Sequence, residues 1–273
     1  MMNPLNPDGQ HAHYVIAVCH QKGGVAKTTT VSVLATIFAM EGHPALAVDL
    51  DPTGNLTASF GLNTVKARRS AADILLGNAP LTSVCTSTRL EGLDVIPSNL
   101  ELSTVSRFLP RRPHYEYLLR TSLAQPGPAG YEFILLDCPP SVAPLTTAAL
   151  TAANLAIIPI QCEYYSLQAL DTMFKTINHV RATTNPGLCF RLLVVMYDQR
   201  GSLHTRVLEL LRGRYADALF DTVIGFDSKL RESQLAGIPI PLFATRSRAT
   251  QQYQTLAREL YAYVEKQTLP ESA

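Results

Sequence analysis

Residues 21–29 read QKGGVAKTT and place two lysines, two glycines and two threonines within nine positions. Gly23 and Gly24 permit a tight turn in which successive backbone N–H groups point at one anion. The segment follows a short apolar run and opens a stretch with helical spacing, which is the context that a phosphate-binding loop requires. A glycine turn that leads into an ordinary helix is the alternative, and the full string favours phosphate binding.

The polar side chains after the glycines have the spacing that nucleotide phosphates need. Lys27 is placed to reach the β- and γ-phosphates, the Thr28 hydroxyl to hold Mg²⁺, and Thr29 to contact the α-phosphate. The positive end of the helix dipole, which begins near Lys27, adds to the attraction for the anion. We therefore expect ATP and Mg²⁺ as cofactors, held by one continuous set of residues: Lys22, Gly23, Gly24, Val25, Ala26, Lys27, Thr28 and Thr29.

Carboxylates end two other apolar runs. Asp49 and Asp51 close the run 45–50, and Asp137 closes the run 133–137. Because ligands bind at the carboxyl ends of parallel strands, these acids are candidates for the same site. Asp137 is expected to hold Mg²⁺ through water. One of Asp49 and Asp51 is expected to face the nucleotide directly; an Asp-Pro turn that closes a strand is the alternative.

The elements that would position these residues alternate along the chain. Continuous apolar runs predict strands that are covered on both faces, which is typical of a mostly parallel sheet. Strand–helix alternation without an internal repeat predicts an α/β fold: a single-domain, doubly wound, mostly parallel sheet flanked by helices. Strands are expected at 14–18, 45–50, 93–97, 133–137, 155–160, 192–196 and 221–224, and helices at 27–40, 141–153, 166–184, 202–215 and 250–266.

Length and composition limit the classes of protein to which the chain can belong. The chain has 273 residues, is 47% hydrophobic and 16% charged, and carries a formal net charge of +1. These values exclude intrinsic disorder, and any binding to nucleic acid needs a local basic patch. Five scattered cysteines without a CxxC pair argue against a zinc site or a disulfide framework, and no apolar run is long enough for a transmembrane helix. We expect a flexible tail over 1–13, one ATPase domain over 14–268 and a C-terminal tail over 269–273.

The phosphate loop fits KGGxxK[ST] rather than the common GxxxxGK[ST], since Gln21 and Ala26 stand where that pattern has glycines. This deviant form resembles the ParA/MinD group of P-loop ATPases, and specifically the chromosomal, Soj-like ParA partition ATPases. The resemblance covers about residues 14–265. It includes DLDPTGN at 49–55, which is similar to DxDPQGN in the family, and PIQCEYYSL at 159–167.

The resemblance implies a division of roles among the charged residues. Lys22 would cross a dimer interface to the ATP phosphates of the partner protomer, Lys27 would bind its own nucleotide, and Asp51 would orient the attacking water. These three are the candidate catalytic residues. Asp49 would lie near Mg²⁺ or support the loop, and Thr53 stands where the family has glutamine. The candidate metal-binding residues are Thr28, Asp49 and Asp137.

Members of that family bind DNA without sequence preference through basic residues on the ATP dimer. Five basic residues and one acid lie between 229 and 258, although a solvated helix face is the alternative for such a run. The segment 224–234 departs from the family sequence IPRNVRLSEAP, and Arg231 is expected to compensate for the arginine lost at 226. The candidate DNA-binding residues are Arg200, Lys229, Arg231, Arg246 and Arg248, and the candidates for adenine contact are Met196, Gly225 and Phe226.

The function implied by the resemblance is chromosome or plasmid partitioning by a cytoplasmic, nucleoid-associated ATPase. ATP would drive a homodimer onto DNA, and a ParB-like partner would stimulate slow hydrolysis. An orphan relative that positions another cargo, such as a chemotaxis cluster or a carboxysome, would use the same residues. A metabolic enzyme related to dethiobiotin synthetase would need a second polar pocket, and none is visible in the sequence. A MinD-like regulator would need a basic amphipathic end, whereas 267–273 is acidic and contains proline, so no membrane contact is expected.

Overall fold

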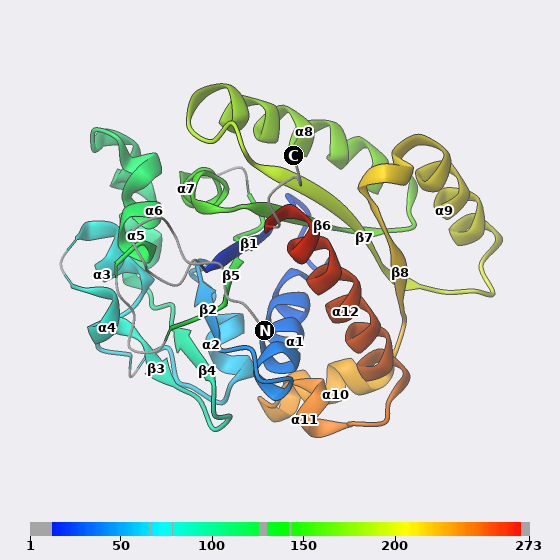
Figure 1. Ribbon diagram of the computed structural model, residues 1–273, viewed down its shortest axis with the longest axis horizontal. Helices are drawn as coiled ribbons and strands as arrows, with labels where there is room; N and C mark the ends of the chain where they lie inside the picture. The colour runs from blue at the N-terminus through cyan, green and yellow to red at the C-terminus, as the bar shows by residue number, and fades with distance from the viewer. Residues whose placement is uncertain (1–12, 66, 78, 126–129, 142–143, 269–273) are drawn as a thin grey trace.

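The computed structural model describes residues 13–65, 67–77, 79–125, 130–141 and 144–268. Within these residues eight strands form one sheet between two layers of helices (Figure 1). The strands are β1 (Tyr14–Val18), β2 (Ala45–Asp49), β3 (Thr86–Ser87), β4 (Leu93–Ile96), β5 (Phe133–Asp137), β6 (Leu155–Gln161), β7 (Cys189–Tyr197) and β8 (Leu219–Gly225).

The strand order is β3-β4-β2-β5-β1-β6-β7-β8, and every pair is parallel apart from β3 with β4. The predicted doubly wound, mostly parallel sheet is therefore confirmed. β1 lies in the middle, with β5 on one side and β6 on the other. The carboxyl ends of these three strands meet at one edge, which is where ligands bind in open α/β sheets.

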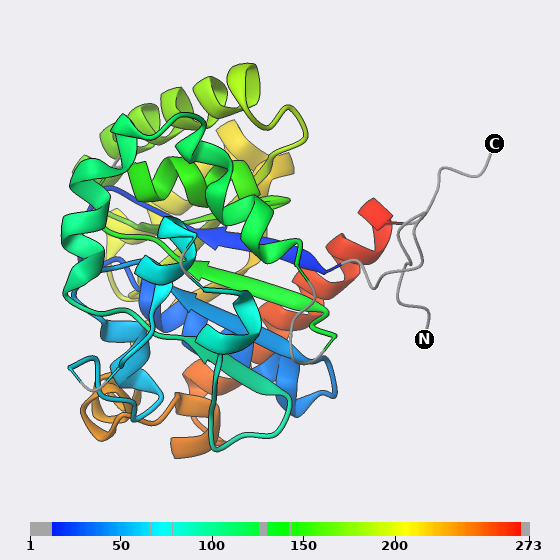
Figure 2. The same ribbon diagram turned by 90° about the vertical axis from the view of Figure 1, so that its left-hand side faces the viewer.

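Helices cover both faces of the sheet. Figures 1 and 2 place α7 and α8 on one side, and α1 and α12 on the other. The helices are α1 (Lys27–Met40), α2 (Asn55–Ser59), α3 (Ala71–Leu76), α4 (Leu81–Val84), α5 (Glu101–Phe108), α6 (Leu118–Leu123), α7 (Pro144–Ala152), α8 (Tyr164–Thr183), α9 (Ser202–Tyr215), α10 (Ser228–Ala236), α11 (Ile240–Phe243) and α12 (Arg248–Thr268), with short 3₁₀ turns at Leu109–Arg111, Tyr115–Tyr117 and Ala216–Ala218.

The core is divided by the sheet into two apolar layers. In β1, Val15 and Ala17 face the cluster that includes α7 and α8, while Ile16 and Val18 face the cluster that includes α1 and α12. All four side chains are at most 4% exposed. Continuous burial explains why the strands are apolar at every position rather than at alternate ones.

Several elements differ from the sequence-based expectation. Strands expected at 192–196 and 221–224 begin earlier, at Cys189 and Leu219, and the short strand β3 was not expected. The helices between 55 and 123 and α10 and α11 were also not expected, because they span only four to nine residues and show little helical periodicity. Most of the expected tails, residues 1–12 and 269–273, lies outside the described residues.

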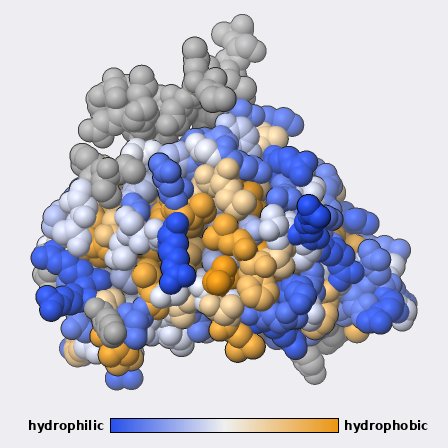
Figure 3. All heavy atoms as spheres, turned by 90° about the horizontal axis from the view of Figure 1, so that it is seen from below, coloured by the Kyte–Doolittle hydropathy of each residue, from blue (hydrophilic) through white to orange (hydrophobic). Residues whose placement is uncertain are grey.

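The face below the sheet in Figure 1 carries apolar surface. Figure 3 shows apolar side chains gathered in the middle of this face, with hydrophilic ones around them. α10 and α11 lie at this side in Figure 1, and they and the turn between them expose Leu235, Ile238, Leu242 and Phe243. Within the described part of the chain, no helix has both the length and the apolar content needed to cross a membrane.

Candidate nucleotide-binding site

The phosphate loop turns between β1 and α1, as the sequence predicts. Gly24 has φ +74°, and Ala26, the residue before α1, has φ 58° and ψ 26°. Both lie in the left-handed region, which costs a residue with a Cβ about 1–2 kcal/mol and costs glycine little. The Thr30 N–H donates to the Ala26 carbonyl at 2.9 Å, so the helical bonds begin at this alanine. The loop thus holds Ala26 in a backbone conformation that glycine would adopt without strain.

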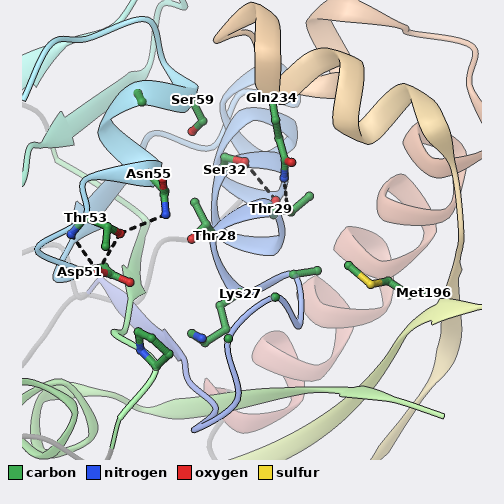
Figure 4. Close-up of a pocket in the computed structure, with 15 residues that line it drawn as sticks. Lys27, Thr28, Thr29, Ser32, Asp51, Thr53, Asn55, Ser59, Met196 and Gln234 are labelled. Carbon is green, nitrogen blue, oxygen red and sulfur yellow. Dashed lines mark hydrogen bonds between the residues drawn. The ribbon is translucent and has the colours of Figure 1, made fainter. Parts of the chain in front are cut away.

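A cavity of about 480 Å³ lies against this loop, which is large enough for a nucleotide (Figure 4). Its other walls come from the start of α1, the segment 51–59, Pro140 after β5, and one residue each from β7 and α10. Of the residues expected to hold the nucleotide, the cavity is lined by Gly23, Gly24, Ala26, Lys27, Thr28, Thr29 and Met196, and Lys22, Val25, Gly225 and Phe226 are not part of its lining.

The two lysines of the loop have different surroundings. Lys27 is 7% exposed, lines the cavity, and donates through Nζ to the Lys22 carbonyl at 3.2 Å. The Lys22 ammonium donates to Gln161 Oε1, at the end of β6, at 3.0 Å and to Glu163 Oε2, just before α8, at 2.5 Å. Only Lys27 therefore serves the cavity of its own chain.

Thr28 and Asp137 form the part of the site that suits a metal ion. The Thr28 hydroxyl donates to Asp137 Oδ2 at 2.7 Å, and Asp137 Oδ1 is buried without a hydrogen-bond partner among the described residues. Burial raises the pKa of Asp137 well above its ordinary value, and the nearby Asp49 raises it further. A buried carboxylate oxygen without a partner, beside a threonine hydroxyl, is a donor set that fits Mg²⁺.

The carboxylate of Asp49 is hydrogen-bonded to other residues of the protein. Its Oδ2 accepts hydrogen bonds from the Thr57 N–H at 2.8 Å and the Thr57 hydroxyl at 2.6 Å, and its Oδ1 accepts from the Asp51 N–H at 3.2 Å. Burial raises the pKa of Asp49 to about 6, although the bonds from Thr57 act in the opposite direction. Of the two roles expected for Asp49, these contacts favour support of the loop over contact with the metal.

Asp51 faces the cavity and is fixed by the residue that replaces the family glutamine. Its Oδ1 accepts from the Thr53 N–H at 2.9 Å and from the Thr53 hydroxyl at 2.8 Å, and Asn55 Nδ2 donates to the same hydroxyl at 3.0 Å. Figure 4 shows these three side chains on one wall, opposite Met196. Thr53 therefore orients the carboxylate that would act on water.

The far wall of the cavity comes from β7 and α10. Met196 adopts φ 54°, a left-handed value that is strained for a non-glycine residue. Gln234, on α10, donates through Nε2 to the Thr29 hydroxyl at 2.6 Å, and both side chains line the cavity. Phe226, one of the expected adenine contacts, instead is 46% exposed and lies under the Arg231 guanidinium at 5.1 Å.

The expected DNA-binding residues lie in the loop after β7 (Arg200), on α10 (Lys229 and Arg231), and just before and at the start of α12 (Arg246 and Arg248). Arg200 is paired with Asp198 at 3.1 Å, and its hydrogen bonds lower the pKa of Asp198 to about 2. Lys229 donates to Glu232 at 2.6 Å, and Arg248 donates to the Phe226 carbonyl. Arg246 is exposed and has no hydrogen-bond or ion-pair partner among the described residues. Arg231 and Arg248 both contact Phe226, so the structure brings these two basic residues together, and several of the five have partners within the chain.

Gln234 and His20 are among the residues that hold the site and that the sequence did not predict. Gln234 lies 205 residues from its partner Thr29. His20 is 2% exposed, and its Nδ1 accepts from the Lys22 N–H at 3.0 Å. Burial, reinforced by the charge of Lys27, lowers the pKa of His20 to about 4, so the ring stays neutral. Its position directly before the loop was the signal that could have identified it.

A phosphate loop at the end of a central parallel strand, with a buried aspartate on the next strand beside the loop threonine, defines a P-loop nucleotide-binding protein. Comparison with known proteins agrees. A family profile described as an AAA domain matches residues 13–190. The chain belongs to this family and, within it, to the ParA/Soj partition ATPases, as two whole-length relatives show.

The chain is 38% identical to the chromosome partitioning protein ParA of Caulobacter vibrioides over 248 residues, which cover 90% of this chain and 93% of that protein. It is 36% identical to the sporulation initiation inhibitor protein Soj of Bacillus subtilis over 249 residues, 91% of this chain and 98% of that one. A cobyrinic acid a,c-diamide synthase from Mycobacterium smegmatis, solved with an ATP analog and magnesium, is similar in structure, with a TM-score of 0.82 and 31% identity over 94% of this chain and 97% of that one.

Proposed function

We propose that this protein is an ATP-driven switch that partitions chromosomes or plasmids. The observation that carries the proposal is that Lys27 and Thr28 line one cavity and that Asp137, bonded to Thr28, has a buried carboxylate oxygen left for a metal ion. MgATP would bind there through the loop N–H groups and Lys27, and Mg²⁺ would be held by Thr28 and Asp137. Mg²⁺ supplies charge neutralisation for the phosphates. The relatives named ParA and Soj support partitioning as the process.

Homodimerisation is proposed from the position of Lys22. Lys22 does not line the cavity of its own protomer. Its ammonium forms an ion pair with Glu163, and 38% of the lysine side chain is exposed. A second protomer facing the cavity would bring a triphosphate to this exposed lysine, and the charge of the phosphates would compete with Glu163. ATP would thereby favour the dimer through contacts that ADP lacks.

Slow hydrolysis follows from the same geometry. Asp51 lines the cavity and is oriented by Thr53, whereas Lys22 is bonded to Glu163 and would reach a triphosphate only in a dimer. Water attack would need both groups in place, so a single protomer should turn over poorly. A ParB-like partner that stabilises the assembled dimer would accelerate the reaction, and release the protein from DNA.

Binding to nucleoid DNA is proposed for the basic residues around α10 and the start of α12. Contacts of lysine and arginine with phosphates do not depend on sequence and weaken steeply as salt rises. Arg246 is the best candidate for a phosphate contact, because its guanidinium is exposed and unpaired among the described residues. Arg200 would first have to break its ion pair with Asp198. Such binding would place the protein in the cytoplasm, on the nucleoid.

The experiment is binding to random-sequence duplex DNA with ATP, ADP or no nucleotide, at two salt concentrations. Binding that requires ATP and weakens with salt is expected. Lys27→Ala should lose ATP and DNA binding together, and Arg246→Glu should lose DNA binding with ATP binding intact. Arg107→Glu, on the exposed surface of α5 across the sheet, is the matched control. Binding of ATP without DNA binding in any state would refute the nucleoid role, and retained ATP affinity in Lys27→Ala would refute the phosphate loop.

A metabolic ATP-dependent enzyme is the second candidate, and one observation favours it. A separate cavity of about 540 Å³ has Arg68, Arg69 and Ser83 in its lining, so a second pocket with charged residues exists where the sequence showed none. Arg69 donates to Ser83 Oγ at 2.7 Å. If the protein is such an enzyme, an anionic substrate bound in this pocket should accelerate ATP hydrolysis when neither DNA nor a protein partner is present. Hydrolysis that responds only to a protein partner would favour the switch.

A further inference from the structure

Gln161, at the end of β6, lies outside every role assigned so far and joins three parts of the site. Its Oε1 accepts from the Lys22 ammonium at 3.0 Å, and its Nε2 donates to the Gly24 carbonyl at 3.1 Å and to Met196 Sδ at 2.9 Å. One side-chain amide therefore contacts the phosphate loop twice and the far wall of the cavity once.

The orientation of this amide is determined by its partners. The Lys22 ammonium is a donor only, and the Gly24 carbonyl is an acceptor only. Turning the amide over would place donor against donor and acceptor against acceptor. Gln161 is thus held in one orientation, with its N–H groups toward Gly24 and Met196.

Of the residues that Gln161 contacts, Lys22 is also held by Glu163, whereas Gly24 and Met196 have few other side-chain restraints. Gly23 and Gly24 have no side chains, and a Cβ added at either would meet nothing within 4 Å. Among the described residues, the side-chain hydrogen bond to the backbone of 23–25 comes from Gln161. Met196 is held in a left-handed conformation at the opposite wall, and its sulfur bonds to the same amide.

We propose that Gln161 is a positioning residue that couples the phosphate end of the cavity to the base end, an inference that rests on the proposed binding of MgATP. By fixing the Gly24 carbonyl, it keeps the loop N–H groups turned toward the phosphates. By fixing Met196, it sets the wall against which the base lies. A nucleotide with the wrong base would displace Met196 and, through Gln161, disturb the loop that holds its phosphates, so that base and phosphate recognition reinforce one another.

Two substitutions at Gln161 separate its contacts. Gln161→Glu keeps an acceptor for Lys22 and removes the donors to Gly24 and Met196, whereas Gln161→Met removes donors and acceptor at similar length. Gln251→Glu, at an exposed position on α12, is the matched control for the added charge. Calorimetry with ATP and with GTP, each with Mg²⁺, gives the two affinities, and thermal melting of the nucleotide-free proteins reports on the fold.

Both Gln161 variants are expected to bind ATP about tenfold more weakly, because two hydrogen bonds that prepare the site are lost. The preference for ATP over GTP should narrow, and the melting temperature should stay within about 2 °C of the wild type. Gln251→Glu should match the wild type in every measurement.

Unchanged ATP affinity in the Gln161 variants would overturn the inference, as would an equal loss for ATP and GTP. Loss in Gln161→Glu alone would show that its charge, rather than positioning, is responsible, and would also overturn it. If the wild type itself binds no nucleotide, the proposed function fails instead, and the two failures are distinguishable.

Discussion

Replacing His20 by asparagine should change how the stability of the nucleotide-free protein depends on pH. The ring of His20 is 2% exposed and accepts a hydrogen bond from the Lys22 N–H, and burial beside Lys27 lowers its pKa from 6.5 to about 4. Protonation would remove that acceptor and add a positive charge next to Lys27. Asparagine offers an acceptor oxygen near the place of Nδ1 and does not titrate in this range.

The magnitude follows from the two pKa values. Because the folded-state pKa of His20 lies below the unfolded-state value, its stabilisation is complete above pH 6.5 and is lost as the pH falls toward 4. The difference between 6.5 and about 4 corresponds to about 3 kcal/mol in full, of which about 2 kcal/mol is lost between pH 7 and pH 5. The wild type should therefore lose about 2 kcal/mol more unfolding free energy than His20→Asn over this interval.

Urea unfolding of both proteins at pH 5 and pH 7 measures this difference. Comparing the two proteins is essential, because Asp49 titrates with the opposite sign. Its folded-state pKa is raised from 3.8 to about 6, so its effect is a loss of stability as the pH rises through this range. The contribution of Asp49 is common to both proteins and cancels. Equal losses in the wild type and in His20→Asn would refute the assignment of His20 as a buried neutral base.

Three further changes test other parts of the site. Ala26→Gly should raise the melting temperature by about 1–2 °C, since relief of the left-handed alanine is partly offset by the flexibility of glycine in the unfolded chain; a lower melting temperature would contradict this. Asp137→Asn should raise the melting temperature of the nucleotide-free protein, because a buried carboxylate is removed, and calorimetry should show that Mg²⁺ no longer strengthens ATP binding. Glu163→Gln frees Lys22 from an exposed ion pair, so sedimentation should show ATP-dependent dimerisation about two- to fivefold tighter, and an unchanged dimer would mean that this pair does not restrain Lys22.

The sequence predicted the centre of the fold to the residue. β1 at 14–18, β5 at 133–137 and α1 at 27–40 have the expected bounds. At these places a continuous apolar run, a glycine turn and a helical stretch follow one another without ambiguity. The same local signals placed Lys27 and Thr28 at the cavity and Asp137 beside them.

The remainder of the site depends on contacts between distant parts of the chain, which local patterns do not contain. Gln161 meets Lys22 across 139 residues, and Gln234 meets Thr29 across 205. Two of the adenine contacts were predicted from the family resemblance in the segment 224–234, where this chain departs from the family sequence. There the cavity wall comes from α10, and Phe226 turns outward under Arg231.

The hydrogen bond between Gln234 and Thr29 has a consequence for how nucleotide state is transmitted. Thr29 is expected to receive the α-phosphate, so an incoming nucleotide would compete with Gln234 for the same hydroxyl. Gln234 lies on α10, and the same helix carries Lys229 and Arg231. A ligand in the cavity would thereby change a contact of the helix that carries these two basic residues. The outer side of α10 can accordingly diverge to suit a new target while the chemistry of the phosphate loop stays as it is.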